Sequence, residues 1–263
     1  MPGVLVGHAD DRESLTGCTA ILFERPAIVG ADVRGSSPGT RETARLAPTA
    51  SVRHTDAILL TGGSAFGLAA ADGVVRFLEE KGVGLDVGVV KIPLVSAAVL
   101  FDLMLGDPNI RPDPRMGYEA AANAKSGPFE QGNAGAGTGA TVGKVLGMQR
   151  AMKGGVGSAA FHLEGGIIVG AIAAVNAFGD VREPATGNLL AGPRLDDGSP
   201  GDTVELLPEA ATRLRWGRNT TLCVVATNAR LAKTEVTKVA QMAHDGLARA
   251  IQPVHTTVDG DAV

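Results

Sequence analysis

A hydroxyl residue lies where a polar segment turns into a buried strand. Asn219 and Thr220 precede the apolar run 221–227, so the sequence places the Thr220 hydroxyl at the entrance of a strand. Further along, Asp259 and Asp261 flank a single glycine, and this spacing puts both carboxylates on the same side of an extended segment. Such a pair can hold an ammonium or orient a hydroxyl. The plainer alternative, which the residues alone leave open, is a strand start and an unrelated polar turn.

A glycine-rich stretch, 135–144, ends at Lys144. Backbone N–H groups in such stretches can bind phosphate at the start of a helix. The spacing is wrong for a P-loop, because Thr138 replaces the first glycine and Val145 replaces the hydroxyl residue that would hold magnesium. A dinucleotide fingerprint also fails, since Ala140 stands where its third glycine should be. We therefore expect a strand that lets another backbone approach closely, with Lys144 either a surface charge at its end or a buried cation in a site.

Ser64 follows an apolar strand and precedes a helical pattern, which is the setting of a hydrolase nucleophile elbow. Phe66 breaks the G-x-S-x-G pattern, so the residues favour a helix N-cap at Ser64. The five histidines could supply a base, but no pair has the spacing of a metal site. We expect neither a metal nor another cofactor.

The composition favours a globular protein that handles a small ligand. The chain has 263 residues, which is enough for a core without disulfides, and Cys18 and Cys223 lie in apolar runs where free thiols pack as small hydrophobes. The net charge of -4 does not favour binding to nucleic acid or to an anionic membrane. The start of the chain lacks a signal-peptide pattern and no apolar run approaches about 18 residues, so we expect a soluble, cytoplasmic protein.

Strands and helices alternate in the hydrophobic pattern. Short apolar runs predict strands at 18–23, 27–33, 57–61, 87–92 and 221–227. Helical spacing predicts helices at 65–82, 96–105, 116–125, 206–216 and 231–251. The middle, 132–179, is rich in glycine and β-branched residues and predicts closely packed strands, whereas 182–202 carries three prolines and predicts an exposed loop.

Several of these segments together resemble the P1 family of peptidases. This is the L-aminopeptidase/D-esterase group, which includes β-peptidyl aminopeptidases and the endo-type hydrolase of 6-aminohexanoate (nylon) oligomers. The matching stretches run in order through nearly the whole chain: LLTGGSAFGLAAADGVVRFLEEKGVG, IPLVSAAVLFDL, GNAGAGTGATVGK, GGVGSA, VNAFGD, NTTLCVVATNA and DGDAV. Within the family the sequence is most similar to the nylon-oligomer branch, chiefly through NTTLCVVATNARLAKTEVTKVAQMAHDG.

The resemblance implies an α/β fold, a four-layer αββα sandwich resembling N-terminal-nucleophile hydrolases, with residues 1–263 forming one domain. It also implies a precursor that cuts itself between Asn219 and Thr220 into a large chain, 1–219, and a small chain, 220–263. The freed Thr220 would then attack amide bonds and form an acyl-enzyme, with its own α-amino group, whose pKa is about 7.7–8.0 in model peptides, as the base. A homotetramer of cleaved protomers is implied as well.

The resemblance gives roles to four further residues. Asn176 would donate its side-chain amide to the developing oxyanion. Lys144 would help to hold the polar network, and Asp259 and Asp261 would orient the Thr220 hydroxyl and ammonium by accepting hydrogen bonds.

Two other residues receive no catalytic role. Ser64 becomes a structural or pocket-lining turn. Tyr118, the only tyrosine, does not align with the tyrosine that some relatives place near the nucleophile. Relatives also continue past the DGD segment with a further strand and helix, so the resemblance leaves two expectations for a sequence ending at Val263: it is truncated and exposes apolar surface, or this member completes its core differently.

The leading hypothesis is a self-processing amide hydrolase acting on small peptides or linear 6-aminohexanoate oligomers. An L-aminopeptidase/D-amino-acid esterase or a β-peptidyl aminopeptidase of the same family is the first alternative. A serine hydrolase that uses Ser64 and an inactive paralogue or binding protein are the others. Because aromatic residues are only 3% of the chain, we expect a substrate pocket lined by small aliphatic groups.

Overall fold

Two facing β-sheets form the centre of the molecule. The structure, a computed structural model, describes residues 1–210 and 218–263. The first sheet has the order β1-β2-β4-β7-β3 and is formed by β1 (Val4–Asp11), β2 (Thr16–Ile28), β4 (His54–Thr61), β7 (Val95–Val99) and β3 (Thr40–Arg41). The second sheet has the order β10-β11-β14 and is formed by β10 (Gly155–His162), β11 (Ile168–Asn176) and β14 (Thr220–Thr227). All pairs are antiparallel except β4 with β7.

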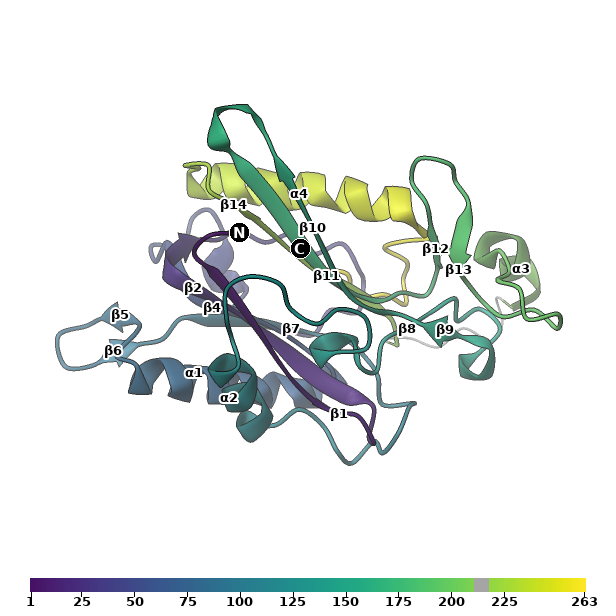
Figure 1. The fold of residues 1–263 in the computed structure, drawn as a ribbon, viewed down its shortest axis with the longest axis horizontal. Coiled ribbons are helices and arrows are strands. Elements are labelled where there is room, and N and C mark those ends of the chain that lie inside the picture. Colours follow the sequence, from purple (N-terminus) through teal and green to yellow (C-terminus); the bar gives the residue numbers. More distant parts are fainter. Residues whose placement is uncertain (211–217) are drawn as a thin grey trace.

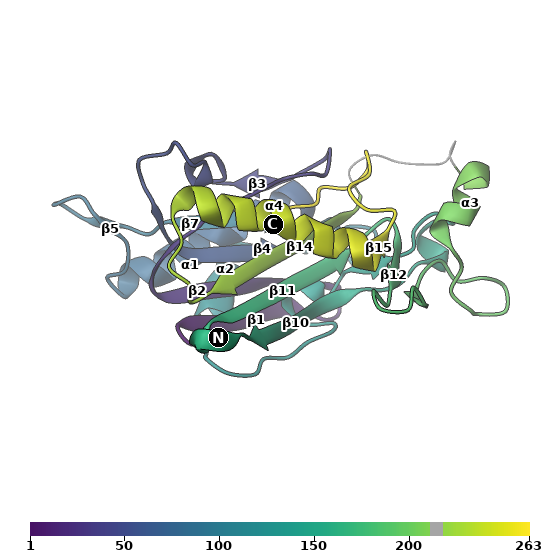
Figure 2. The same cartoon turned by 90° about the horizontal axis from the view of Figure 1, so that it is seen from above.

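Helices cover the outer faces of both sheets. Helices α1 (Ala70–Glu80) and α2 (Pro114–Ala122) lie against the first sheet, and α4 (Lys233–Ala250) lies across the second (Figure 1). The view from above shows α4 crossing β14 and β11 (Figure 2). The four layers are therefore helix, sheet, sheet and helix, which confirms the predicted αββα sandwich.

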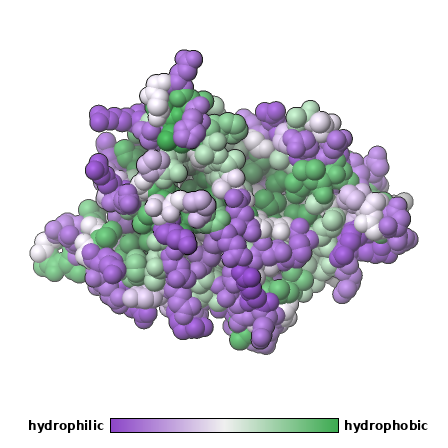
Figure 3. All heavy atoms as spheres, in the orientation of Figure 1, coloured by the Kyte–Doolittle hydropathy of each residue, from purple (hydrophilic) through white to green (hydrophobic). Residues whose placement is uncertain are grey.

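Smaller elements lie at the ends of this sandwich. A third sheet contains β12 (Asp180–Arg182), β13 (Leu189–Ala191) and β15 (Ile251–Gln252), and α3 (Thr203–Ala210) follows it. Two short hairpins are formed by β5 (Leu85–Asp86) with β6 (Lys91–Ile92) and by β8 (Thr141–Val142) with β9 (Met152–Lys153). The short 3-10 helices are η1 (Ala44–Leu46), η2 (Ser64–Ala69), η3 (Gly135–Gly137), η4 (Met148–Arg150) and η5 (Glu164–Gly166). The β5–β6 hairpin projects from the body (Figure 1), and apolar residues lie on the surface there (Figure 3). Val89, between the two strands, is 93% accessible.

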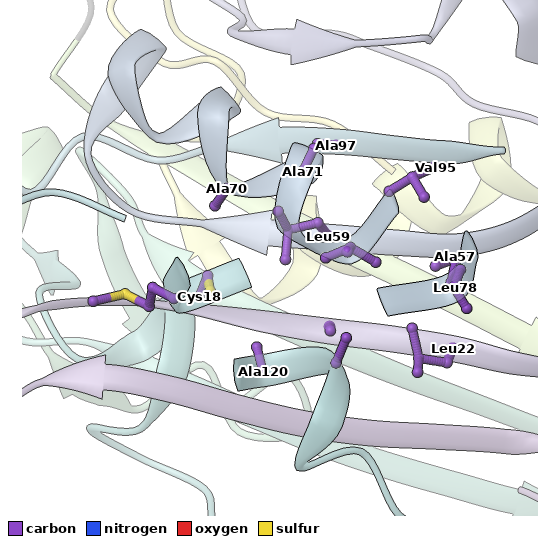
Figure 4. Close-up of a cluster of buried hydrophobic side chains, with 14 residues drawn as sticks. Cys18, Leu22, Ala57, Leu59, Ala70, Ala71, Leu78, Val95, Ala97 and Ala120 are labelled. Carbon is purple, nitrogen blue, oxygen red and sulfur yellow. The ribbon is translucent and has the colours of Figure 1, made fainter. Parts of the chain in front are cut away.

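The apolar interior has one layer on each face of the first sheet. The layer under α1 and α2, which we call the helix-covered core, is built from Cys18, Ala20, Leu22, Ala57, Leu59, Ala70, Ala71, Val74, Leu78, Val95, Ala97, Met116, Ala120 and Ala121 (Figure 4). Its many small residues let the two helices approach closely. A Cβ on Gly73 would lie 1.8 Å from the Pro114 carbonyl oxygen, so glycine is required at this crossing. The second layer fills the space between the sheets with Val6, Ile21, Leu60, Leu100, Ala134, Ala136, Ala140, Val156, Ile172, Ala174, Leu222 and Ala262.

An apolar groove runs along β14 on the side opposite β11. It has a volume of about 980 Å³ and is lined by β2, β4, β7, β14 and α4, with Ile28, Leu60 and Val224 among its aliphatic side chains. The last residues of the chain, Ala262 and Val263, also line it. None of the helices that the structure describes has the length and apolar character needed to cross a membrane.

Several predicted elements are displaced or wrong. The first part of the predicted helix at 96–105 belongs to strand β7, which pairs in parallel with β4, and residues 100–105 form turns and irregular structure. A strand buried on both faces loses the polar alternation that would identify it, so its apolar run imitates a helix. The predicted strand at 87–92 is the turn and second arm of the β5–β6 hairpin, and that at 27–33 ends at Ile28 as part of β2. The predicted loop at 182–202 contains β13, and the second half of the predicted helix at 206–216 lies outside the described residues.

Candidate active site

The candidate site lies at one end of the second sheet, where β11 finishes and β14 starts. The register pairs Asn176, the last residue of β11, with Thr220, the first residue of β14. The chain near its end runs beside this point, because Asn219 and Asp259 form a parallel bridge and Leu222 and Ala262 form another. Thr220 is 4% accessible, so the hydroxyl is enclosed by these segments.

The Thr220 hydroxyl contacts the carbonyl group that precedes it. It donates a short hydrogen bond to the Asn219 carbonyl oxygen, and the Gly260 N–H donates to the same oxygen at 2.9 Å. The Asn219 side chain is held separately, through its Nδ2, by the Val258 carbonyl oxygen at 3.1 Å. A Cβ on Gly260 would lie 2.5 Å from the Ser37 carbonyl oxygen and 2.8 Å from Thr220 Oγ1. Glycine is thus needed at 260 for its N–H to reach this carbonyl.

Asp259 and Asp261 are both buried, and each accepts hydrogen bonds from a different set of donors. Asp259 accepts from the Phe178 N–H at 3.2 Å and from the backbone and hydroxyl of Thr256. Burial, and then the charge of Asp261, raises the pKa of Asp259 to about 6. Asp261 Oδ1 accepts from the Thr221 N–H at 2.5 Å, so this carboxylate fixes the residue next to Thr220.

Lys144 reaches the same point from the loop after β8. Its Nζ donates to the backbone oxygen and to the Oδ1 of Asn176, both at 2.8 Å, and to the Arg218 carbonyl oxygen at 3.4 Å. Burial lowers the pKa of Lys144 to about 7, while the charges of Asp259, Asp261 and Asp102 oppose this shift. Lys144 is half-buried, and its ammonium points into this network rather than to the surface, as the second of the two alternatives expects.

Asn176 is fully buried and all its contacts lie within the network. Its Oδ1 accepts from Lys144 and from the Thr141 N–H at 3.0 Å, and its Nδ2 donates to the Phe101 carbonyl oxygen at 2.8 Å. The backbone donor on the Asn219 carbonyl is therefore the Gly260 N–H, not the Asn176 amide. The expected role of the Asn176 amide as an oxyanion donor stays a prediction for the cleaved chain.

Three residues near the site, of which His244 and Asp102 are buried and His255 is half-buried, were not singled out from the sequence. His255 donates to Asp261, and His244 of α4 lies behind it. Asp102 accepts from the Thr16 hydroxyl and the Gly63 N–H, both at 2.7 Å, and burial raises its pKa. Because His255 and Asp261 are close in the sequence, their shared site could have been predicted. His244 and Asp102 reach the site only through contacts that are distant in sequence.

Two residues considered from the sequence lie elsewhere. Ser64 is the first residue of η2 with a left-handed φ of 53°, and the cap position is Gly63, so the predicted N-cap at Ser64 is wrong. Tyr118 belongs to the α1–α2 pair, where its hydroxyl donates to Glu80 at 2.6 Å. Cys18 and Cys223 are free and buried, as predicted. In the parts of the chain that the structure describes, no group of three or more His, Cys, Asp or Glu side chains could hold a metal ion.

The comparisons agree with this architecture. The fold is that of aminopeptidases with an N-terminal-nucleophile (Ntn) hydrolase fold, and the chain is a hydrolase of peptide or amide bonds. It belongs to Peptidase family S58, whose profile matches residues 1–263.

Relatives of two kinds are similar to the chain. An uncharacterised aminopeptidase of Mycobacterium tuberculosis (strain ATCC 25618 / H37Rv) is 45% identical over 99% of this chain and 78% of its own length. The 6-aminohexanoate-oligomer endohydrolase of Kocuria sp. (strain KY2) is 34% identical over 100% of this chain and 72% of its own length. Among solved structures, the L-aminopeptidase D-Ala-esterase/amidase of Ochrobactrum anthropi has a TM-score of 0.75 at 22% identity, covering 100% of this chain and 70% of that one. At that identity the structural likeness supports the fold alone.

Proposed function

We propose that this chain is a self-processing N-terminal-nucleophile amide hydrolase. It cuts itself between Asn219 and Thr220 into a large chain, 1–219, and a small chain, 220–263, and Thr220 then becomes the catalytic nucleophile. The observation that carries the proposal is the contact of the buried Thr220 hydroxyl with the Asn219 carbonyl, which also receives the Gly260 N–H.

The self-cleavage step needs few groups beyond those in contact. Thr220 Oγ1 attacks the Asn219 carbonyl carbon, and the negative charge on the carbonyl oxygen develops against the Gly260 N–H. The C–N bond then breaks, the proton of the hydroxyl passes to the Thr220 nitrogen, and an ester remains. Water hydrolyses this ester, releasing an Asn219 carboxylate and regenerating the Thr220 hydroxyl. A fixed N–H donor at a developing oxyanion contributes about 3–4 kcal/mol in other hydrolases.

After cleavage the same site acts on external amides. The new α-amino group of Thr220 takes the proton from its own hydroxyl, since its pKa is about 7.7–8.0 in model peptides. Asp259 and Asp261 hold the resulting ammonium and orient the hydroxyl, and Lys144 holds Asn176 beside the nucleophile. Asn176 then donates to the oxyanion of the substrate once the Asn219 carbonyl has left.

The substrates are small peptides or linear oligoamides such as 6-aminohexanoate oligomers, as the name of the Kocuria relative suggests. A second candidate is exo-acting aminopeptidase activity, including action on D-amino-acid esters and β-peptides. The 45% identity to mycobacterial proteins that carry the name aminopeptidase favours it. We also propose a homotetramer of cleaved protomers, which light scattering would test.

Substitution of Thr220 tests the proposal directly. Thr220→Ala should leave a single uncut chain without amidase activity, because no hydroxyl remains at the site, whereas Thr220→Ser should still be cut. Denaturing intact-mass measurement of both variants reads the outcome. Cleavage of Thr220→Ala at the same bond would refute the proposal, and loss of turnover in an uncut Ser64→Ala variant would favour a serine hydrolase.

Assays of the cleaved protein separate the two substrate classes. A panel of amino-acid anilides reports exo action, and a 6-aminohexanoate oligomer followed by mass spectrometry reports endo action. Absence of turnover on every amide and ester, together with an uncut wild-type chain, would favour an inert or binding protein.

A further inference from the structure

A line of hydrogen-bonded side chains leads from the buried Asp261 through the half-buried His255 to the buried His244, away from Thr220. Asp261 Oδ2 accepts from the His255 ring Nδ1 at 2.8 Å and from the His255 backbone N–H at 3.0 Å. The His255 Nε2 lies 3.2 Å from the Nδ1 of His244, and the His244 Nε2 lies 3.1 Å from the Asp32 carbonyl oxygen. The self-cleavage mechanism above uses neither histidine.

The local structure is shaped to make these contacts. His255 has a left-handed φ of 52°, and this conformation lets both its backbone N–H and its ring face the same carboxylate oxygen. His244 lies on α4 and is completely buried. The two rings meet edge to face with centroids 4.6 Å apart, so they contact each other directly.

The number of protons needed for these hydrogen bonds determines the charge on the two imidazole rings. It begins at a carboxylate and ends at a backbone carbonyl, and neither group donates when Asp261 is ionised. Three contacts in a row need three protons, but two neutral imidazoles carry only two ring protons. With Asp261 ionised, every contact is therefore satisfied only when the two rings hold one additional proton between them.

We propose that His255, backed by His244, is a positioning residue pair: the two imidazoles share one positive charge and fix Asp261, which holds the Thr221 N–H and thereby the Thr220 nucleophile. The proposal rests on the proposed function only for the role of Thr220. The pairing of the two rings with Asp261 stands independently of it.

The groups around the pair determine how it responds to pH. Asp261 faces His255, whereas Asp32 and Arg34 face His244, and Arg34 in turn pairs with Asp32 at 3.0 Å and with Asp245 at 3.8 Å. Burial lowers the pKa of His244; the Asp32 backbone bond opposes this shift, and the charges of His255 and Arg34 add to it. The additional proton is present at low pH and leaves as pH rises. One of the three contacts then brings two acceptor atoms together without a proton between them, and the line loosens.

Amide substitutions separate positioning from simple packing. In His244→Asn the side-chain amide can replace the ring Nδ1 and donate to His255 without titrating, whereas His244→Leu removes the donor. His255→Asn keeps a donor toward Asp261 and tolerates the left-handed φ. His162→Asn, at the exposed end of β10, is the matched control.

The rates of self-cleavage, followed by intact mass after cell-free synthesis, and of anilide hydrolysis are measured from about pH 5 to about pH 8, the range over which imidazoles titrate. At each pH, the rate of each variant is divided by the wild-type rate, so that the effects of titrating groups present in both proteins cancel. We expect the ratio for His244→Asn to rise by about two- to tenfold with pH, which corresponds to one hydrogen bond, while His162→Asn gives a flat ratio. His244→Leu should be about tenfold slower at acid pH, and His255→Asn should keep most of the rate. A flat ratio for His244→Asn would overturn the positioning role.

Nitrogen-15 NMR of the histidine rings counts the protons directly, and the variants assign the two residues. Three protonated ring nitrogens on the pair at about pH 5 support the shared charge, and two neutral tautomers at that pH would overturn it. This count does not depend on cleavage. An uncut, inactive wild type with three ring protons would therefore refute the proposed function while leaving the imidazole pair intact.

Discussion

The helix-covered core and the candidate active site are both buried, but they are stabilised by different physics. In the helix-covered core, small and aliphatic side chains exclude water and need no specific partners. At the end of β11 and β14, the buried groups are ionisable or amide side chains, and each charge is held by named donors or acceptors. Burying such groups costs free energy unless they are paired. The comparison indicates that the polar end of the sandwich is retained for chemistry.

Lys144→Met should produce the largest change in self-cleavage among the supporting residues. Methionine fills a similar volume but leaves the Asn176 oxygens and the Arg218 carbonyl without their ammonium donor. A hydrogen bond to a charged group contributes about 1.5–3 kcal/mol, and two such bonds at 2.8 Å are lost with their hold on Asn176, so cleavage should slow by about 10²-fold or more. Intact-mass time courses measure this rate. Lys153→Met, which removes a lysine bonded to the Thr138 carbonyl, is the control and should be cut normally.

Gly260→Ala tests the contact at the bond to be cut. The added methyl would meet the Ser37 carbonyl oxygen and Thr220 Oγ1, so the N–H must move away from the Asn219 carbonyl. We expect cleavage to slow by about 10–100-fold, somewhat less than the loss of a whole oxyanion donor. The matched control is Gly246→Ala, because a Cβ there meets nothing within 4 Å. Equal cleavage rates in the two variants would show that the Gly260 N–H has no part in the reaction.

Leu59→Ala tests the helix-covered core instead of the candidate active site. Leu59 is completely buried in the helix-covered core, and its truncation should lower the free energy of unfolding by about 2–5 kcal/mol. The folded fraction should still cleave itself at the wild-type rate, since no polar contact of the site is touched. Denaturant unfolding and intact mass, measured on the same sample, test this separation. A cleavage defect in fully folded Leu59→Ala would mean that the two regions are coupled.

Changing the pH should alter the free energy of unfolding less than Leu59→Ala does. This effect should come from ionisable groups of the candidate active site. Folded Lys144 has a pKa of about 7 against 10.5 for the free side chain, so between these values the unfolded chain binds the extra proton. Raising pH through this window should therefore raise the melting temperature, and Lys144→Met should abolish that rise. Folded Asp259 has a raised pKa of about 6, so the folded chain holds the extra proton between pH 3.8 and 6 and stability should fall as pH rises there. Thermal unfolding of the uncut Thr220→Ala chain at several pH values measures both effects.

The four layers came from the resemblance, whereas the residues alone predicted several strands and two elements of the candidate site. The β-branched run after Thr220 predicted β14, and the spacing of Asp259 and Asp261 marked a polar pair that the fold brings to Thr220. The resemblance supplied Lys144 and Asn176, which the structure joins at 2.8 Å.

The incorrect and missed predictions also have physical causes. Strand β7 was predicted as a helix because burial on both faces removes alternation from a parallel strand. The N-cap at Ser64 failed because a glycine with a left-handed φ takes the cap position instead. His244 and His255 were not distinguished from the other histidines, because their contact depends on the placement of α4 and on a left-handed turn at His255, neither of which is visible as a local pattern.

The central claim is that the chain cuts itself before Thr220, and intact mass of the wild-type protein after incubation at neutral pH tests it most directly. The account predicts two species, roughly 22 kDa for residues 1–219 and roughly 4.5 kDa for residues 220–263, scaled from average residue mass. The smaller species should begin with threonine. A single chain of 26.7 kDa that hydrolyses amides, or a new N-terminus at another residue, would contradict the account.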